Sequence, residues 1–232
     1  MLEVRGLTAG YEGGDVVHDV AFHVDRGEAV MIIGSNGAGK TTLFRSLIGL
    51  LTPSSGTVRF EGHDIAGLPA QRIVRLGVSF VPAERHLFPR MTVHENLALG
   101  SYPDRPDPDT MKRVMDLFPR LSERRRQRAG TMSGGEQQML AMGRALMAKP
   151  RLIVLDEPTT GLAPKLAGEA YQALGELRDR GLTILVAEQQ VPLAMALSDR
   201  GYVLENGAIR MEGTSAQLAS DPDVQRAYLG VV

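Results

Sequence analysis

Residues 34–42 read Gly34-Ser35-Asn36-Gly37-Ala38-Gly39-Lys40-Thr41-Thr42, and they directly follow the apolar run Ala29-Val30-Met31-Ile32-Ile33. The pattern GxxxxGKT between a strand and a helix is typical of a phosphate-binding loop. Its glycines let successive backbone N–H groups converge on phosphate oxygens at the positive end of the helix. In such a loop Lys40 reaches the β and γ phosphates, and Thr41 contacts a Mg²⁺ ion. The alternative is an ordinary glycine-rich turn, but the strand and helix patterns on either side favour a nucleotide site.

Composition narrows the class of protein. The 232 residues carry 26 basic and 27 acidic side chains, so a formal net charge of -1 does not indicate a surface that coats nucleic acid. The chain has no cysteine for a disulfide or a thiolate metal site. The first residues lack the pattern of a secretory signal, and no apolar run approaches the roughly 18 residues that cross a bilayer. We expect a soluble, cytoplasmic protein that binds no nucleic acid.

Hydrophobic patterns along the chain predict an α/β fold. Continuous aliphatic runs at 152–155 and 183–186 are typical of strands covered on both faces in a parallel sheet. Alternating apolar residues on either side of the turn Glu12-Gly13-Gly14 predict an antiparallel hairpin. Further strands are expected at 57–60, 78–81 and 202–204, a hairpin turn at Asn206-Gly207, and helices over 43–51 and 166–177.

We expect a single domain made of two parts. Residues 1–83 and 149–232 form the core and an antiparallel β subdomain, and residues 84–148 form an inserted α-helical subdomain. The expected fold class is therefore α/β with a mixed, mostly parallel sheet.

Two adjacent carboxylates end the first of the aliphatic runs. Asp156 and Glu157 follow Leu152-Ile153-Val154-Leu155, at the edge where α/β sheets bind ligands. Asp156 can hold Mg²⁺, and Glu157 can accept a proton from the water that attacks a γ phosphate, or orient it. The alternative is that both carboxylates only cap the next helix.

A second helix start has the residues of an anion site. Met132-Ser133-Gly134-Gly135-Glu136 precedes a helical pattern, and Ser133 with Glu136 matches a capping box. By itself this motif favours a purely structural cap. Together with the phosphate-binding loop and the carboxylate pair, it favours function.

These three motifs, in this order, resemble the ATP-binding cassette (ABC) family over essentially the whole chain, with residues 132–136 at the family's signature sequence. The resemblance implies a P-loop NTPase core, ATP and Mg²⁺ as ligands, and two cassettes that face head to tail. Metal contacts would come from Thr41 and Asp156, and catalytic contacts from Lys40, Glu157 and Gln189. The nucleotide contacts that it implies are Tyr11, Gly34, Ser35, Asn36, Gly37, Ala38, Gly39, Lys40, Thr41 and Thr42 of one chain, with Ser133, Gly134, Gly135 and Glu136 of the other.

Tyr11 matches the aromatic residue that stacks on adenine in this family, a contact worth about 1 to 3 kcal/mol. The alternative is a turn aromatic packed on the first hairpin.

Three positions depart from the family pattern. Pro164 follows Gly161-Leu162-Ala163 where an aspartate is common, and Gln189 stands where most cassettes carry a histidine. An amide can hydrogen-bond to a γ phosphate but does not titrate as imidazole does. Ala83 occupies the position of the glutamine that senses Mg²⁺ and water, and Glu84 can replace it only if the loop shifts register.

Strings such as Phe88-Pro89-Arg90-Met91-Thr92-Val93 and Asp199-Arg200-Gly201-Tyr202-Val203-Leu204-Glu205 resemble the LivF-type ATP-binding subunits of branched-chain amino acid importers. This resemblance implies an ATPase that energises import while attached to the inner face of the cell membrane. Its partners would be a second, related cassette, two membrane permease subunits and, indirectly, an external solute-binding protein. Homodimer and heterodimer both remain open, as does the identity of the solute.

Two alternative functions remain. A soluble cassette of DNA repair or translation would use the same nucleotide chemistry, but the short stretch between Lys40 and Ser133 leaves no room for a long coiled-coil insertion. A largely non-catalytic subunit of a heterodimeric importer would account for Ala83 and Gln189.

Two surface segments carry further alternatives. The run Glu123-Arg124-Arg125-Arg126-Gln127-Arg128 is expected to be a solvated face rather than a phosphate-binding patch. Leu87 and Phe88 either line a groove for a membrane partner or pack in the local core.

Overall fold

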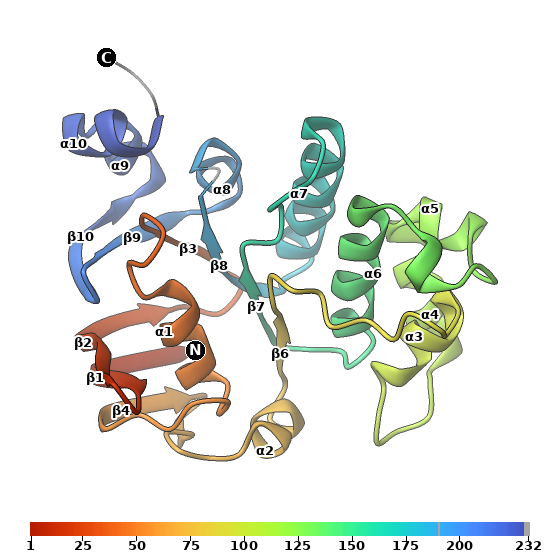
Figure 1. Cartoon of the computed structure of the whole chain (residues 1–232), viewed down its shortest axis with the longest axis horizontal. Helices are drawn as coiled ribbons and strands as arrows, with labels where there is room; N and C mark the ends of the chain where they lie inside the picture. The colour runs from red at the N-terminus through yellow and green to blue at the C-terminus, as the bar shows by residue number, and fades with distance from the viewer. Residues whose placement is uncertain (190, 230–232) are drawn as a thin grey trace.

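The apolar run before the glycine-rich loop forms β3 (Ala29–Ile33), near the middle of the larger sheet (Figure 1). The computed structural model describes residues 1–189 and 191–229, and in these residues the larger sheet has the order β10-β9-β3-β8-β7-β6. Its neighbouring strands run parallel except for β10, which is antiparallel to β9. The other strands of this sheet are β6 (Val78–Val81), β7 (Leu152–Asp156), β8 (Thr183–Glu188), β9 (Arg200–Glu205) and β10 (Ala208–Thr214).

The central strands are buried on both faces, as their continuous apolar runs predict. Val30 and Ile32 of β3 lie in one hydrophobic cluster, and Met31 and Ile33 lie in another on the opposite face. Successive strand residues point to opposite faces, so a strand covered on both sides needs apolar residues at every position.

The smaller sheet is antiparallel, as the hairpin pattern predicts, and has the order β2-β1-β4-β5 in the part of the chain that the structure describes. It lies at the red and orange end of the molecule, beside α1 (Figure 1). Its strands are β1 (Leu2–Tyr11), β2 (Gly14–Val24), β4 (Ser55–Phe60) and β5 (His63–Asp64).

The helices pack on both faces of the larger sheet. The cluster that contains Met31 includes side chains from α6, α7 and α8, and the cluster that contains Val30 includes α1 and the smaller sheet. The helices are α1 (Lys40–Leu47), α2 (Ala70–Arg75), α3 (Val93–Leu99), α4 (Pro108–Leu117), α5 (Pro119–Glu123), α6 (Gly134–Leu146), α7 (Pro164–Asp179), α8 (Val191–Leu197), α9 (Ser215–Ser220) and α10 (Pro222–Val224), with short turns η1 (Ala129–Thr131) and η2 (Gln225–Leu229).

The expected elements are present, with one difference in length. The helix predicted over 43–51 ends at Leu47, and Leu51 lies outside it. Gly49 has a φ of 71°. The carbonyl oxygens of Arg45 and Phe44 accept hydrogen bonds from the backbone N–H groups of Leu50 and Ile48, respectively. The helix therefore ends at a left-handed glycine before the predicted turn begins.

The Asn206-Gly207 turn joins β9 to β10, with φ values of 48° and 79°. Positive φ at both central residues is the geometry that a two-residue hairpin requires. Residues 84–148 hold α3, α4, α5 and α6, which form the green part of Figure 1. Within residues 1–189 and 191–229, no helix is both long enough and apolar enough to cross a membrane.

Candidate functional site

The glycine-rich loop connects the end of β3 to the start of α1. Gly37 and Gly39 have φ values of 82° and 105°, which a side chain would strain. A Cβ on Gly34 would lie 2.4 Å from the carbonyl oxygen of Leu204, so the loop also passes too close to β9 for any side chain there. The first turn of α1 carries no acidic residue and its N-cap makes no side-chain hydrogen bond. Its N–H groups can therefore serve an anion.

Lys40 lies inside this loop and is only 5% exposed. Its Nζ donates to the carbonyl oxygens of Gly34 at 2.7 Å and Ser35 at 3.2 Å. The same Nζ lies 3.4 Å from Glu157 Oε1. The ammonium group thus stands between the phosphate-binding loop and the carboxylate that follows β7.

Glu157 is the meeting point of several predicted site residues. Gln189 Nε2 donates to Glu157 Oε1 at 2.8 Å and also to Asn36 Oδ1. The hydroxyl of Thr160 donates to Glu157 Oε2 at 3.2 Å. Glu157 has a φ of 46°, a left-handed conformation that is strained for a residue with a side chain. The backbone at the end of β7 is held in an unusual shape that aims this carboxylate at Lys40.

Asp156 is 1% exposed, and its Oδ1 has no hydrogen-bond partner in the described part of the chain. Burial raises the pKa of Asp156 to about 6, and the carboxylates of Glu157 and Glu84 act in the same direction. The nearby Thr41 hydroxyl and Lys40 oppose this shift. An orphaned buried carboxylate oxygen beside a threonine hydroxyl fits Mg²⁺, which prefers oxygen ligands and shares its remaining positions with water and phosphate.

The carboxylate pair does not cap the following helix. The N-cap of α7 is Ala163, and no side chain bonds there. The alternative reading of Asp156 and Glu157 as helix caps is therefore wrong.

Glu188 was not assigned a role by the sequence patterns, yet it organises the loops around Glu157. It is 1% exposed, and its Oε1 accepts from the backbone N–H and the hydroxyl of Thr159 at 3.0 and 2.6 Å. Its Oε2 accepts from the backbone N–H of Gln189 at 3.0 Å. Burial and the Glu188 carboxylate raise the pKa of Tyr171 well above its usual value. A carboxylate at the end of an otherwise apolar strand was the signal that could have identified this network.

Arg45 of α1 joins two residues at the rim of the site. Its guanidinium donates to the Tyr11 hydroxyl at 3.4 Å and lies 3.6 Å from Glu84 Oε1. Tyr11 is 49% exposed, so about half of its surface is open to solvent at this rim. Glu84 is near enough to affect the pKa of Asp156, whereas Ala83 supplies no polar side chain.

Ser133, Gly134, Gly135 and Glu136 begin α6 as expected, with both hydrogen bonds of the capping box formed. Arg124 lies 2.9 Å from Glu136 Oε1. Burial disfavours the charge on Glu136, but the Ser133 donors and Arg124 outweigh burial and lower its pKa. In Figure 1, α6 stands apart from α1, and within the described residues no hydrogen bond or ion pair joins residues 133–136 to the loop around Lys40. The chain does not bring its own Ser133 to its own Lys40.

The structure places the residues of both surface segments. Leu87 is partly buried against the larger hydrophobic cluster, whereas Phe88 is 48% exposed and lies beneath Arg144, 5.8 Å from its ring centre. Phe88, Leu99 and Tyr102 line a cavity of about 580 Å³. Residues 123–126 are exposed, as expected for a solvated face.

Residues 17–160 match the family model described as ABC transporter. The chain belongs to the ABC transporter family. It is 48% identical to the high-affinity branched-chain amino acid transport ATP-binding protein BraG of Pseudomonas aeruginosa, over 99% of this chain and 100% of that protein. It is 37% identical to the probable branched-chain amino acid transport ATP-binding protein LivF of Archaeoglobus fulgidus, over the full length of both. A nucleotide-free ATP-binding cassette from an ABC transporter has a TM-score of 0.86 and 29% identity, with 100% and 99% of the two chains covered.

The resemblance to ABC cassettes and the expected fold class are thereby confirmed. The cassette is an ATPase subunit coupled to transport, and the non-transporter alternative is not favoured. A solved cassette in its ADP conformation, with a TM-score of 0.85, also supports nucleotide binding by this fold.

Proposed function

We propose that this cassette hydrolyses ATP to energise the import of branched-chain amino acids. The observation that supports the catalytic role is that Lys40 and Gln189 both contact the Glu157 carboxylate beside the phosphate-binding loop. The full-length similarity to BraG and LivF supports the solute class.

Some residues at the site would bind ATP and Mg²⁺, and others would take part in the hydrolysis step. Lys40 would exchange the carbonyls of Gly34 and Ser35 for the β and γ phosphates of ATP. Glu157 would then be free to orient the attacking water and accept its proton, and the Gln189 amide would donate to the γ phosphate. Thr41 and Asp156 would hold Mg²⁺, which neutralises charge on the phosphates.

Turnover of ATP by the purified chain tests the catalytic role. We expect Glu157→Gln to lower the steady-state rate by at least about 100-fold, the range for a general base, with ATP binding retained. Glu205→Gln, an exposed carboxylate at the end of β9, is the control and should leave the rate near that of the wild type. Equal and measurable rates for wild type and Glu157→Gln would contradict the assignment, whereas no turnover by either, with ATP still bound, would mean that hydrolysis needs the second, related cassette.

Uptake of labelled leucine tests the physiological role. Cells that lack the gene should recover ATP-dependent uptake with the wild-type chain and not with Glu157→Gln. A wild-type chain that hydrolyses ATP but has no effect on leucine, isoleucine or valine uptake would support the ATPase role and contradict the proposed solute class.

We also propose the arrangement of partners. Two permease subunits would hold the cassette on the inner face of the cell membrane, with Phe88, Leu99 and Tyr102 facing a permease segment. An external solute-binding protein would act indirectly. A second, related cassette would present its Lys40-type loop to Ser133 and Gly134 of this chain, because α6 lies away from this chain's own loop.

The division into a core with β subdomain (1–83 and 149–232) and a helical subdomain (84–148) remains part of this proposal, as do the roles of the site residues. The distribution of α3 to α6 within 84–148 supports it.

A further inference from the structure

A cavity of about 390 Å³ lies at the opposite edge of the sheet from Lys40. Thr183 is the first residue of β8, Arg151 immediately precedes β7, and Arg26 precedes β3. The phosphate-binding loop follows the last residue of β3, so the same strands separate the cavity from the nucleotide site. A cavity of this size is within the range of small-molecule sites.

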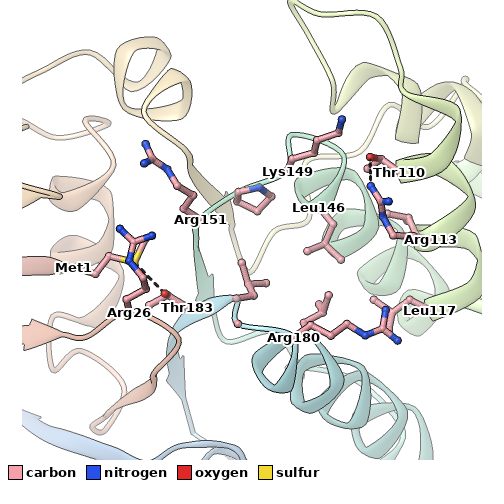
Figure 2. Close-up of a pocket in the computed structure, with 15 residues that line it drawn as sticks. Met1, Arg26, Thr110, Arg113, Leu117, Leu146, Lys149, Arg151, Arg180 and Thr183 are labelled. Carbon is pink, nitrogen blue, oxygen red and sulfur yellow. Dashed lines mark hydrogen bonds between the residues drawn. The ribbon is translucent and has the colours of Figure 1, made fainter.

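The floor of the cavity is apolar and comes from several helices. Leu117 ends α4, Leu146 ends α6, and Leu177 lies in the last turns of α7, with Val114 and Leu182 completing the surface. Figure 2 shows Leu146 nearer the middle of the cavity and Leu117 on the side of α4. This surface favours an aliphatic group over water.

Cationic side chains surround this floor on both sides. They are Arg26 and Arg151 on the side of the smaller sheet, Arg113 and Lys149 on the side of α4, and Arg180 at the end of α7 (Figure 2).

Nearby carboxylates neutralise only part of this charge. Within residues 1–189 and 191–229, the only carboxylate that pairs with Arg26 and Arg151 is that of Glu61. In the same residues, Asp107 is the only carboxylate that pairs with Lys149, at 2.8 Å, and with Arg113, at 3.9 Å. Each side of the cavity therefore keeps one positive charge in excess, and Arg180 pairs with Glu176 at 3.9 Å.

We propose that this cavity binds a free amphipathic organic anion: an aliphatic body with a carboxylate or phosphate head group. The apolar floor would cover the aliphatic body, and the excess positive charge on the rim would pair with the head group. An inorganic anion would leave the floor unfilled, and a neutral alcohol would leave the rim charge unmatched.

Isothermal titration of the full-length chain with decanoate, below its micelle concentration, tests the proposal. Decanoate should bind at least about tenfold more tightly than acetate or decanol, because each lacks one of the two interactions. Binding should persist when the chain is saturated with ADP, since the nucleotide site lies at the other edge of the sheet.

The double variant Arg113→Gln/Arg180→Gln should weaken decanoate binding by at least about tenfold. Arg125→Gln/Arg126→Gln removes the same charge from exposed positions outside the cavity and should have no effect. Equal affinity of the two double variants, equal binding of decanol and decanoate, or loss of binding in ADP would each overturn the proposal. The proposal would also be overturned if the chain sedimented with phosphatidylglycerol vesicles in a way that depends on Arg113 and Arg180 but did not bind free decanoate. The comparison of decanoate, acetate and decanol on the wild-type chain stands even if a variant folds poorly.

Discussion

At the scale of single residues, the end of β7 places two adjacent carboxylates in different surroundings. The Glu157 side chain is 17% exposed, lies beside Lys40 and accepts a hydrogen bond from Gln189. Asp156 is buried, and its Oδ1 has no hydrogen-bond partner in the described residues. Asp156, the last residue of β7, is buried beside Thr41, whereas the left-handed backbone at Glu157 turns the next carboxylate toward the phosphate-binding loop. Environment, rather than residue type, separates the proposed metal ligand from the proposed base.

The burial of Asp156 predicts a pH-dependent stability. Its pKa of about 6 in the folded chain exceeds the usual 3.8, so its favourable contribution is present below about pH 4 and is lost as the pH rises through 6. Without Mg²⁺ and nucleotide, Asp156→Asn should remove a cost on the order of 3 kcal/mol at pH 8 and little at pH 4. Urea unfolding at both pH values measures it. Identical pH dependence in the variant and the wild type would rule out the buried charge as the cause.

Tyr11 tests the proposed adenine contact. Tyr11→Ala should weaken ATP binding about tenfold, because a stacking contact of this kind is worth about 1 to 3 kcal/mol. Tyr11→Phe keeps the ring but loses the hydroxyl that accepts from Arg45, and it should bind ATP as the wild type does. A titration in which Phe weakens binding as much as Ala would assign the effect to the Arg45 contact instead.

At the scale of elements, α6 and α9 both start with a capping box, as α3 also does, but they differ in location. Ser133 and Glu136 cap α6, and Thr214 and Gln217 cap α9. Only the first cap has a glycine pair after it and an arginine from another segment, Arg124, on its glutamate. Comparing these two helices separates the effect of losing a cap on stability from the effect of losing a proposed contact with nucleotide.

Ser133→Ala and Thr214→Ala should each lower the free energy of unfolding by about 1 kcal/mol, since each removes an N-cap. Only Ser133→Ala should also lower ATP turnover in the assembled transporter. Urea unfolding and steady-state hydrolysis measure the two effects. If Thr214→Ala slowed hydrolysis equally, the loss would reflect stability rather than a contact with nucleotide.

At the scale of the whole molecule, α6 and the Lys40 loop belong to different parts of the chain (Figure 1). A complete site of the proposed kind therefore needs two cassettes. We propose, from Ala83 and Gln189, that the site on this chain's own loop is the slower of the two in a mixed dimer.

In such a mixed dimer, Ser133→Arg should reduce turnover more than Glu157→Gln. The first would block the partner's faster site by placing a bulky cation where Ser133 contacts it, and the second would remove the base only from this chain's site. Hydrolysis by the co-purified complex measures both variants, with the wild-type complex as reference. An equal loss would count against the asymmetry.

Local sequence patterns are sufficient to specify the elements and the motif residues. A GxxxxGKT pattern after an apolar run specifies a strand, a loop with positive φ and a helix start, because these depend on neighbours within a few positions. Continuous aliphatic runs likewise specified the buried strands β7 and β8, and the box around Ser133 specified the start of α6.

Contacts between side chains from distant segments are specified by the tertiary packing. The contacts of Glu188 with Thr159, of Arg45 with Glu84 and of Arg124 with Glu136 have no local pattern. The same holds for the cavity between Arg151 and Arg113, whose lining residues are far apart in sequence. Local patterns encode backbone geometry and burial, but contact between distant segments depends on how the buried faces of helices and sheets pack together.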